Sequence, residues 1–405
     1  MMKKYLLLLT VLVAFTACRK EKDELEFVET LTKTSIVGTM SIEQVQSLMS
    51  DYASFKPYIQ TGISLYKIEY NTVFNGDRMN VSGMFVIPAD LPEQTPVIVY
   101  NHGTMHKDEA PSFCTPSSYS MDIGLCYICA ALFKCAILIP DYIGHGISSS
   151  VMHPYIHAES LGQTSLDIIR AYYDYTKITP NATLANNKVI ILGYSEGGYT
   201  SVALHKKIQE TAPDIDIVKT YAGAGPYDVE NFVKEVLQQN HDLPAYSISS
   251  YLWVLSTYIT YSGYSKSYGQ IFSAEDDEIL RNNNYSLGYL AQYPINLNPQ
   301  NLFQKEFIDI ILEDKDTEFS KILKENTLTG FVPADSLILF HSEADSWVYV
   351  SNTVNAYNKM KSKGAPVRCE IIPESENKDH GDAAISFFYS TFVNVLTTGV
   401  LTNNE

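Results

Sequence analysis

The sequence predicts an α/β fold, in which a mostly parallel sheet is flanked by helices and carries an inserted, mainly helical cap. Three observations indicate it. Short apolar segments typical of strands buried on both faces recur at residues 96–100, 135–140, 189–192, 217–222 and 336–340. Helical segments alternate with several of these strands, which implies right-handed parallel crossovers. Between residues 227 and 333 the alternation gives way to tyrosine-rich helical stretches.

The composition is that of a folded protein. The 405 residues are 45% hydrophobic and 19% charged, which allows a substantial core in one large or two smaller domains. The formal net charge of −17 argues against a nucleic-acid partner, because neutralising phosphates requires a basic surface. We interpret the acidic balance as a source of solubility.

The first 18 residues have the organisation of a targeting signal. Lys3 and Lys4 precede an apolar run at 5–14 that is too short to span a membrane comfortably, and small residues lead to Cys18. The segment resembles a bacterial lipoprotein signal. The resemblance implies removal of residues 1–17, a lipid on Cys18, and attachment to the outward or periplasmic face of a cell-envelope membrane. An uncleaved anchor or an ordinary secretory signal is the alternative.

These features divide the chain into five parts. The stretch directly after Cys18 is charged and poor in aromatic residues, which is typical of a solvated tether. The predicted parts are the signal at 1–17, the tether at 18–40, the first part of the core at 41–226, the cap at 227–335 and the second part of the core at 336–405.

The first elements of the core are a helix and a hairpin. Ser41 is a helix start signal, and apolar residues recur at helical spacing over 41–54. Segments 64–70 and 79–87 alternate apolar and polar residues, and the tight-turn signal Asn75-Gly76 between them predicts an antiparallel hairpin.

The remaining elements follow from apolar periodicity. A helix is predicted at 157–175, and another follows the strand at 189–192. Three helical stretches are predicted in the cap, at 229–239, 247–261 and 303–324. After the cap we expect a helix at about 351–363, a last strand at 367–372 and a closing apolar helix at 383–396.

Five cysteines follow Cys18, and an odd number cannot all pair internally; they are Cys114, Cys126, Cys129, Cys135 and Cys369. The Cys126-x-x-Cys129 pair lies in an apolar segment of helical character and lacks an accompanying histidine cluster. Buried thiols are therefore favoured over a redox or metal role. A disulfide from Cys114 to Cys126 or Cys129 is the alternative.

The most informative stretch joins the strand at 189–192 to the helix that follows. Gly193, Ser195 and Gly197 form a G-x-S-x-G pattern at this junction. A serine on so sharp a turn projects from the end of the sheet, and the glycines leave room where the backbone is strained. We interpret Ser195 as a nucleophile, with an ordinary strand–helix turn as the alternative.

A serine nucleophile needs a base to take its proton and a carboxylate to orient that base. Asp345 and His380 each follow a predicted strand, and catalytic groups belong at the carboxyl ends of parallel strands. We therefore expect Ser195, His380 and Asp345 to act as nucleophile, base and acid.

Other residues compete for two of these roles. Glu343 lies close to Asp345, but its longer side chain would shift the imidazole. His102 and His145 also follow strands, but both precede the nucleophile, and we expect them to shape loops.

Several motifs together resemble the α/β-hydrolase superfamily, and within it the secretory lipase and esterase group with a large cap. The motifs are Asn101-His102-Gly103, Asp141-Tyr142-x-Gly144-x-Gly146, Gly193-Tyr194-Ser195-Glu196-Gly197-Gly198, Ala344-Asp345 and Asp379-His380. The resemblance extends from about residue 65 to the end. The chain order serine, acid, histidine is the order expected of that superfamily.

The resemblance also implies an oxyanion hole. Its donors would be the backbone N–H of Glu196 and an N–H of the turn after the strand at 96–100, which we assign to Thr104. The carboxylate of Glu196 is expected either to stabilise the imidazolium of His380 or to be solvated.

These observations predict a serine carboxylesterase that uses neither metal nor cofactor and acts on a small-molecule or acylated-glycan ester. A prolyl-oligopeptidase-like peptidase is the second hypothesis, because the same triad cleaves amides. Asp276, Asp277 and Glu278 would then be candidates to hold a substrate amine. The third is a lipid-anchored protein that binds a glycan on an inactive hydrolase scaffold.

Overall fold

The computed structural model describes residues 30–49, 55–92, 95–179, 187–282, 294–398 and 401. The predicted signal, its lipidation site at Cys18 and the stretch up to residue 29 lie outside the described residues. The described chain forms a nine-stranded sheet in the order β1-β2-β3-β5-β4-β6-β7-β8-β9. The strands are β1 (Leu31–Met40), β2 (Ile63–Phe74), β3 (Asp77–Pro88), β4 (Val97–Asn101), β5 (Ile137–Pro140), β6 (Lys188–Tyr194), β7 (Asp216–Gly223), β8 (Leu337–Ser342) and β9 (Val367–Ile372).

The sheet is parallel from β5 to β9 and antiparallel at the other end. β1, β2 and β3 pair antiparallel with their neighbours, and β3 pairs antiparallel with β5. β6 lies between β4 and β7, with Asn101 opposite Gly193 and Gly193 opposite Ala222. This confirms the predicted α/β fold, because the apolar strands β4, β5 and β6 are buried between two layers of helices.

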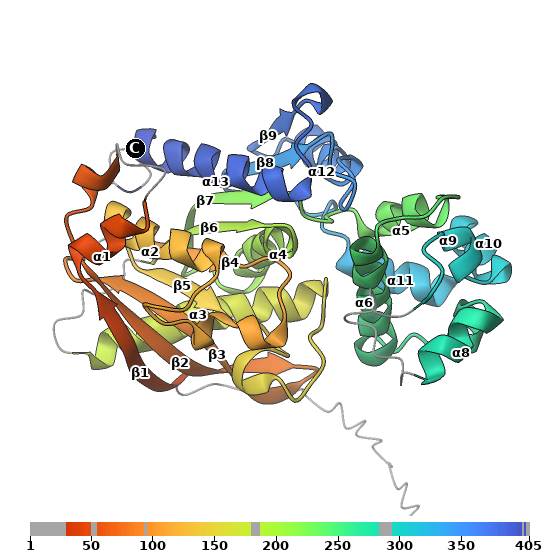
Figure 1. Cartoon of the computed structure of the whole chain (residues 1–405), viewed down its shortest axis with the longest axis horizontal. Helices are drawn as coiled ribbons and strands as arrows, with labels where there is room; N and C mark the ends of the chain where they lie inside the picture. Colours follow the sequence, from red (N-terminus) through yellow and green to blue (C-terminus); the bar gives the residue numbers. More distant parts are fainter. Residues whose placement is uncertain are drawn as a thin grey trace, which may run out of the picture.

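Helices cover both faces of the sheet (Figure 1). On one face, α1, α2 and α13 pack against side chains such as Ile98 and Ile190. On the other face, α3 and α4 pack against Val99, Ile191 and their neighbours. The helices of the core are α1 (Ile42–Ser47), α2 (Met121–Phe133), α3 (Ala158–Ile178), α4 (Glu196–Thr211), α12 (Ser351–Ser362) and α13 (His380–Thr397).

The chain between β7 and β8 forms the cap, which lies beside the sheet at the right of Figure 1. Its helices are α5 (Val229–Leu237), α6 (Ala245–Tyr261), α7 (Tyr268–Ile271), α8 (Ala274–Asn282), α9 (Pro299–Leu302), α10 (Lys305–Leu312) and α11 (Thr317–Asn326). Side chains of these helices and of the core share one hydrophobic cluster. The cap is therefore packed onto the core through a continuous apolar contact.

The prediction of a tether up to residue 40 is wrong in its second half, because β1 occupies Leu31–Met40 and pairs with β2. Most of its side chains are exposed, since it is the edge strand of the sheet. A strand of this kind lacks the apolar alternation that marks a strand with a buried face, and the sequence pattern therefore missed it.

The predicted cap helix at 303–324 is two helices, α10 and α11. Four consecutive charged residues separate them, and Asp314 among them has a φ of +55°. The side chain of Asp316 accepts a hydrogen bond from the N–H of Phe319 at 3.0 Å and caps α11. The charged break and the cap together end one helix and start the next.

All five cysteines within the described residues are free thiols, so the alternative disulfide is not formed. Burial raises the pKa of Cys114 to about 11 and that of Cys129 to about 12. These thiols are therefore protonated at neutral pH and are poor nucleophiles. Among the described residues, no helix is long and apolar enough to cross a membrane.

Candidate active site

Ser195 lies on the turn between β6 and α4. Its φ is +60°, a left-handed conformation that is costly for a residue other than glycine. Its N–H donates to the carbonyl oxygen of Gly223 on β7 at 2.8 Å, which holds the turn against the sheet. A Cβ at Gly193 or Gly197 would overlap the carbonyl oxygen of Asn101 or backbone beside it. The glycines of the motif are therefore required by close backbone packing.

The imidazole of His380 contacts Ser195, with Nε2 2.8 Å from Oγ. His380 is the first residue of α13, three residues earlier than the predicted start of the closing helix. The helix begins here because the carboxylate of Asp379 accepts the N–H of Asp382 at 2.9 Å. The hydroxyl of Tyr194 donates to the carbonyl oxygen of His380 at 2.8 Å, which fixes the helix start against the end of β6.

Asp345 completes the chain of contacts from the loop after β8. Its Oδ2 lies 2.5 Å from Nδ1 of His380 and 3.2 Å from Nε2 of His341. Its Oδ1 accepts the N–H groups of Trp347 at 2.9 Å and of Val348 at 3.0 Å. Burial raises the pKa of this carboxyl, but hydrogen bonds from His341 and His380 outweigh burial and hold the pKa well below its usual value.

The structure thus brings the three predicted residues together in the hydrogen-bonded order Ser195, His380, Asp345. Because Asp345 is ionised, it accepts the Nδ1–H of His380 and leaves Nε2 free to take the hydroxyl proton of Ser195.

The competing residues lie elsewhere. The carboxylate of Glu343 is exposed and accepts the N–H of Glu374 at 2.9 Å. His102 is buried, stacks on Tyr142 and has its Nδ1 2.8 Å from the carbonyl oxygen of Gly103. His145 is buried beside the carbonyl oxygen of Met105. These two histidines hold loops around the nucleophile.

The turn that carries Thr104 lies directly beside the nucleophile. A Cβ added at Gly103 would lie 3.8 Å from Cβ of Ser195 and 3.4 Å from the carbonyl oxygen of Tyr194. The hydroxyl of Thr104 is 2.7 Å from that of Tyr155, which ties the turn to the loop before α3. The backbone of Glu196 starts α4 on the other side of Ser195.

Both expectations for the carboxylate of Glu196 are wrong. The side chain is buried, not solvated, and its Oε1 lies 2.5 Å from Nε2 of His153, not against His380. The reason is that α4 turns this side chain under the loop at 142–156, which supplies His153 as a partner.

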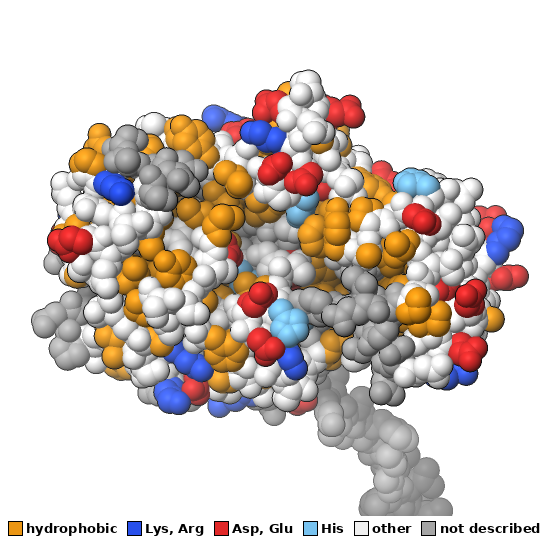
Figure 2. All heavy atoms as spheres, in the orientation of Figure 1, with side chains coloured by type: hydrophobic (Ala, Val, Ile, Leu, Met, Phe, Trp, Pro, Cys, Tyr) orange, Lys and Arg blue, Asp and Glu red, His pale blue; other side chains and the backbone are white. Residues whose placement is uncertain are grey.

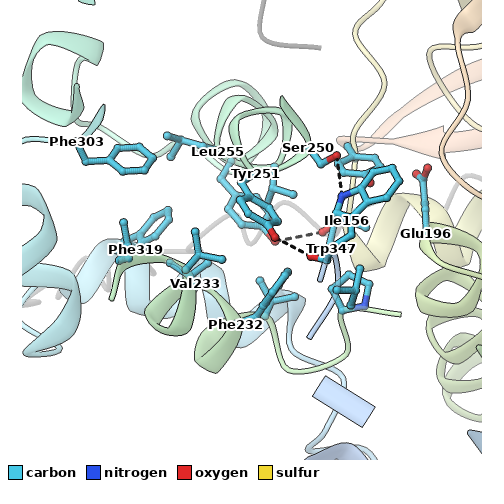
Figure 3. A pocket seen from close by; sticks show the side chains of 18 of the residues that line it. Ile156, Glu196, Phe232, Val233, Ser250, Tyr251, Leu255, Phe303, Phe319 and Trp347 are labelled. Atoms are coloured by element: carbon cyan, nitrogen blue, oxygen red, sulfur yellow. Dashed lines mark hydrogen bonds between the residues drawn. The ribbon is translucent and has the colours of Figure 1, made fainter. Parts of the chain in front are cut away.

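An open pocket, with about 830 Å³ of space including solvent outside its mouth, leads from Ser195 into the cap. Its lining is almost wholly apolar and includes Val233 of α5, Leu255 of α6 and Phe319 of α11. In Figure 3, Glu196 and Phe303 lie at opposite ends of the view, with Tyr251 between them. Figure 2, drawn in the orientation of Figure 1, shows hydrophobic side chains on both sides of a hollow in the middle of the face in view.

Two contacts join the cap to the loop that holds the acid. The hydroxyl of Tyr251 donates to the carbonyl oxygen of Trp347 at 2.6 Å, and the indole N–H of Trp347 donates to the hydroxyl of Ser250 at 3.2 Å (Figure 3). The backbone N–H of Trp347 also donates to Asp345. Two hydrogen bonds in series, through Trp347, therefore connect helix α6 to the acid.

His341 and His153 are site residues that sequence reasoning missed. His341 carried a usable signal, because it directly follows the predicted strand at 336–340 and lies four residues before Asp345. His153 carried none, since its partner Glu196 is 43 residues away in sequence. Within the part of the chain that the structure describes, no group of three or more histidine, cysteine or acidic side chains is arranged to hold a metal ion.

A parallel sheet with an antiparallel end, a serine on a strained turn after β6 and a helical insertion between β7 and β8 define an α/β-hydrolase. The chain belongs to the secretory lipase family, whose sequence model matches residues 114–381, more than half of the chain. A comparison with curated proteins found no match.

Solved structures of similar fold include three hydrolases or proteins proposed to be hydrolases. A protein from Legionella pneumophila proposed to be a hydrolase has a TM-score of 0.80 at 21% identity, over 93% of this chain and 100% of its own. The rice cell wall degrading esterase LipA from Xanthomonas oryzae has a TM-score of 0.72 at 18% identity, over 91% and 97%. Candida antarctica lipase A in its closed state has a TM-score of 0.67 at 16% identity, over 92% and 83%.

The family and the fold make this chain a lipase- or esterase-type hydrolase. Membership of a secretory family indicates an extracellular or envelope protein.

Proposed function

We propose that the chain is a serine carboxylic ester hydrolase that works through an acyl-enzyme. The observation that carries the proposal is the contact of His380 with both Ser195 and Asp345, at 2.8 and 2.5 Å. A hydroxyl, an imidazole and a buried carboxylate in this order are the groups that acyl transfer requires.

In the acylation step, Oγ of Ser195 forms a bond to the ester carbonyl carbon while Nε2 of His380 takes its proton. The resulting oxyanion is stabilised by the backbone N–H groups of Glu196 and Thr104. The C–O bond to the alcohol then breaks, and the proton on His380 passes to the leaving alcohol oxygen. Water repeats the sequence on the acyl-enzyme and releases the acid and the free Ser195.

The apolar pocket supports an ester with a hydrophobic acyl part. The lining offers aromatic and aliphatic side chains, which are suited to contact with a hydrophobic acyl group. Lipids, aryl esters and acylated sugars share this chemistry. Two of the structural neighbours are named as an esterase and a lipase, which supports ester hydrolysis as the reaction.

The cap acids argue against the peptidase hypothesis. Asp276 is buried and accepts two hydrogen bonds from Asn296, at 2.9 and 2.8 Å, while Asp277 pairs with Arg281. Glu278 is exposed, and none of the three acids lines the pocket. Asp276 and Asp277 therefore hold the cap together, and none of the three faces the pocket as a partner for a substrate amine.

We further propose that the mature chain is attached to an envelope membrane through a lipid on Cys18. The proposal depends on the signal-like sequence of residues 1–18. Metabolic labelling with a fatty-acid analogue should modify the wild-type protein and leave Cys18→Ser unmodified. Labelling of both would contradict it.

Labelling with a fluorophosphonate probe tests the serine mechanism. The probe is expected to modify the wild-type protein and not Ser195→Ala. Modification that persists in Ser195→Ala, or that is absent from the wild type, would overturn the proposal. A panel of p-nitrophenyl esters from acetyl to palmitoyl, run beside aminoacyl amides, then separates ester from amide hydrolysis.

A further inference from the structure

A buried pair of side chains lies next to the nucleophile and takes no part in the triad. His153 and Glu196 are both almost fully buried, and Nε2 of His153 is 2.5 Å from Oε1 of Glu196. Nδ1 of His153 is 2.6 Å from the carbonyl oxygen of Ile143. Both ring nitrogens are therefore engaged.

The partners fix the number of protons in this pair. A carbonyl oxygen only accepts, so Nδ1 of His153 carries a proton and donates it to Ile143. A contact of 2.5 Å between Nε2 and a carboxylate oxygen requires one further proton between them. The pair then carries no net charge, whichever of the two atoms holds that proton.

The charge of Glu196 matters because of its place in the chain. Its backbone N–H is the proposed oxyanion donor next to Ser195, and Glu196 is among the residues that line the pocket at Ser195. An unneutralised carboxylate there would oppose the negative charge that develops on the substrate oxygen, and burial strengthens such repulsion.

The same histidine is tied to the cap. The indole N–H of Trp253 on α6 donates to the carbonyl oxygen of His153 at 3.1 Å. The hydroxyls of Tyr261 and Tyr258, also on α6, donate to the carbonyl oxygens of Met152 at 2.7 Å and Ile156 at 3.2 Å. Helix α6 thus holds the loop that positions His153.

We propose that His153 is a positioning residue that neutralises Glu196 and joins cap helix α6 to the oxyanion donor. The inference depends on the proposed serine mechanism for its effect on catalysis. The pair itself is a property of the fold and can be tested without turnover.

The other groups that pack around His153 do not neutralise Glu196. The rings of Tyr142, Tyr155, Trp253 and His145 pack against it, and His102 lies beyond His145. Burial, followed by the neighbouring His153 and His102, holds the pKa of His145 well below its usual value, so His145 stays neutral. Burial raises the pKa of Tyr142 well above its usual value. Among the described groups around this pair, His153 is therefore the one that neutralises Glu196.

The experiment compares pH profiles of kcat for ester hydrolysis. His153→Gln can still donate a hydrogen bond but cannot carry charge. At high pH the carboxylate of Glu196 then lacks a partner that neutralises it, and the kcat of His153→Gln is expected to lie roughly tenfold to hundredfold below that of the wild type, approaching the loss caused by removing an oxyanion donor. The double variant His153→Gln/Glu196→Gln has the same altered loop without the charge, and its kcat should not fall at high pH.

His145→Gln is the matched control, because it changes a buried histidine of the same cluster without touching Glu196. Its pH profile should keep the wild-type shape. A His153→Gln profile that matches the wild type, or a double variant that falls with pH as His153→Gln does, would overturn the proposal.

Proton NMR tests the pair independently of turnover. The short contact predicts a strongly deshielded proton, but the contact between His380 and Asp345 is equally short. His380→Ala removes the signal of the contact between His380 and Asp345. A deshielded proton that is still seen in His380→Ala, and is lost in His380→Ala/His153→Gln, would support the pair of His153 and Glu196. Its absence from His380→Ala would contradict the pair even if ester hydrolysis were confirmed.

Discussion

The hydroxyl of Tyr251 on cap helix α6 donates to the carbonyl oxygen of Trp347, two residues after the acid Asp345, at 2.6 Å. Removing this hydroxyl in Tyr251→Phe frees the acid loop from the cap. A hydrogen bond of this kind contributes about 1 kcal/mol, so kcat is expected to fall about fivefold with little change in KM. Steady-state ester hydrolysis measures it.

Tyr246→Phe is the control for this variant, since the ring of Tyr246 packs 4.8 Å from that of Trp347 and is retained. It should hydrolyse esters at the wild-type rate. Equal loss in both variants would show that the Tyr251 hydrogen bond is not what positions the loop.

The triad contacts predict large losses of turnover. Ser195→Ala and His380→Ala each remove a reacting group, and kcat should fall by roughly 10⁴ or more. Asp345→Asn keeps the shape but reverses the preferred tautomer of His380, so a loss of about 10⁴ is expected as well. Glu343→Gln, on the exposed neighbour of the acid, should keep full activity. An active Asp345→Asn would show that another group orients His380.

The pocket predicts which residues determine the selectivity for acyl chain length. Val233 lies on α5 and lines the pocket inside the cap. Val233→Trp should fill the pocket and lower kcat/KM for palmitoyl esters at least tenfold relative to acetyl esters. Val354→Trp changes an exposed valine of α12 outside the lining and should leave the chain-length profile unchanged. An unaltered profile in Val233→Trp would place the acyl chain elsewhere.

Asp167 on α3 predicts a pH-dependent stability. Burial raises its pKa from 3.8 to about 6, although the amide of Gln163 donates to both of its oxygens. Because the folded state binds this proton more tightly, the contribution to stability is full below about pH 4 and is lost as pH rises through 6. At pH 7 the ionised group costs on the order of 3 kcal/mol.

Asp167→Asn should therefore raise the free energy of unfolding at pH 7 by about 1–3 kcal/mol, with no gain near pH 4. Urea denaturation at both pH values measures it. A gain of equal size at both pH values would mean that packing, not ionisation, is responsible.

The sequence was most informative where one local pattern decides the structure. The buried strand β6 and its glycines predicted the turn of Ser195, and Asp345 and His380 were proposed because each follows a predicted strand. Contacts between segments that are distant in the sequence have no local pattern from which they could be predicted. Glu196 was placed wrongly because its partner His153 belongs to a loop that only the folded chain brings under α4.

Edge and cap elements were harder to predict for a different reason. β1 is mostly exposed, so its pairing with β2 has no apolar signature in sequence. The break between α10 and α11 depends on the side chain of Asp316 accepting the N–H of Phe319. A run of charged residues does not by itself predict which of them caps a helix.

The pairing of β1 with β2 also has a mechanical consequence. The backbone N–H of Thr30 donates to the carboxylate of Asp174 on α3 at 2.7 Å, and β1 continues from there into eight register pairs with β2. Tension applied through the chain that precedes Thr30 would load this ladder first, at the margin of the sheet opposite β9. A pull on the predicted tether would thus be borne by backbone hydrogen bonds at the edge of the sheet, not by the elements that carry Ser195, Asp345 and His380.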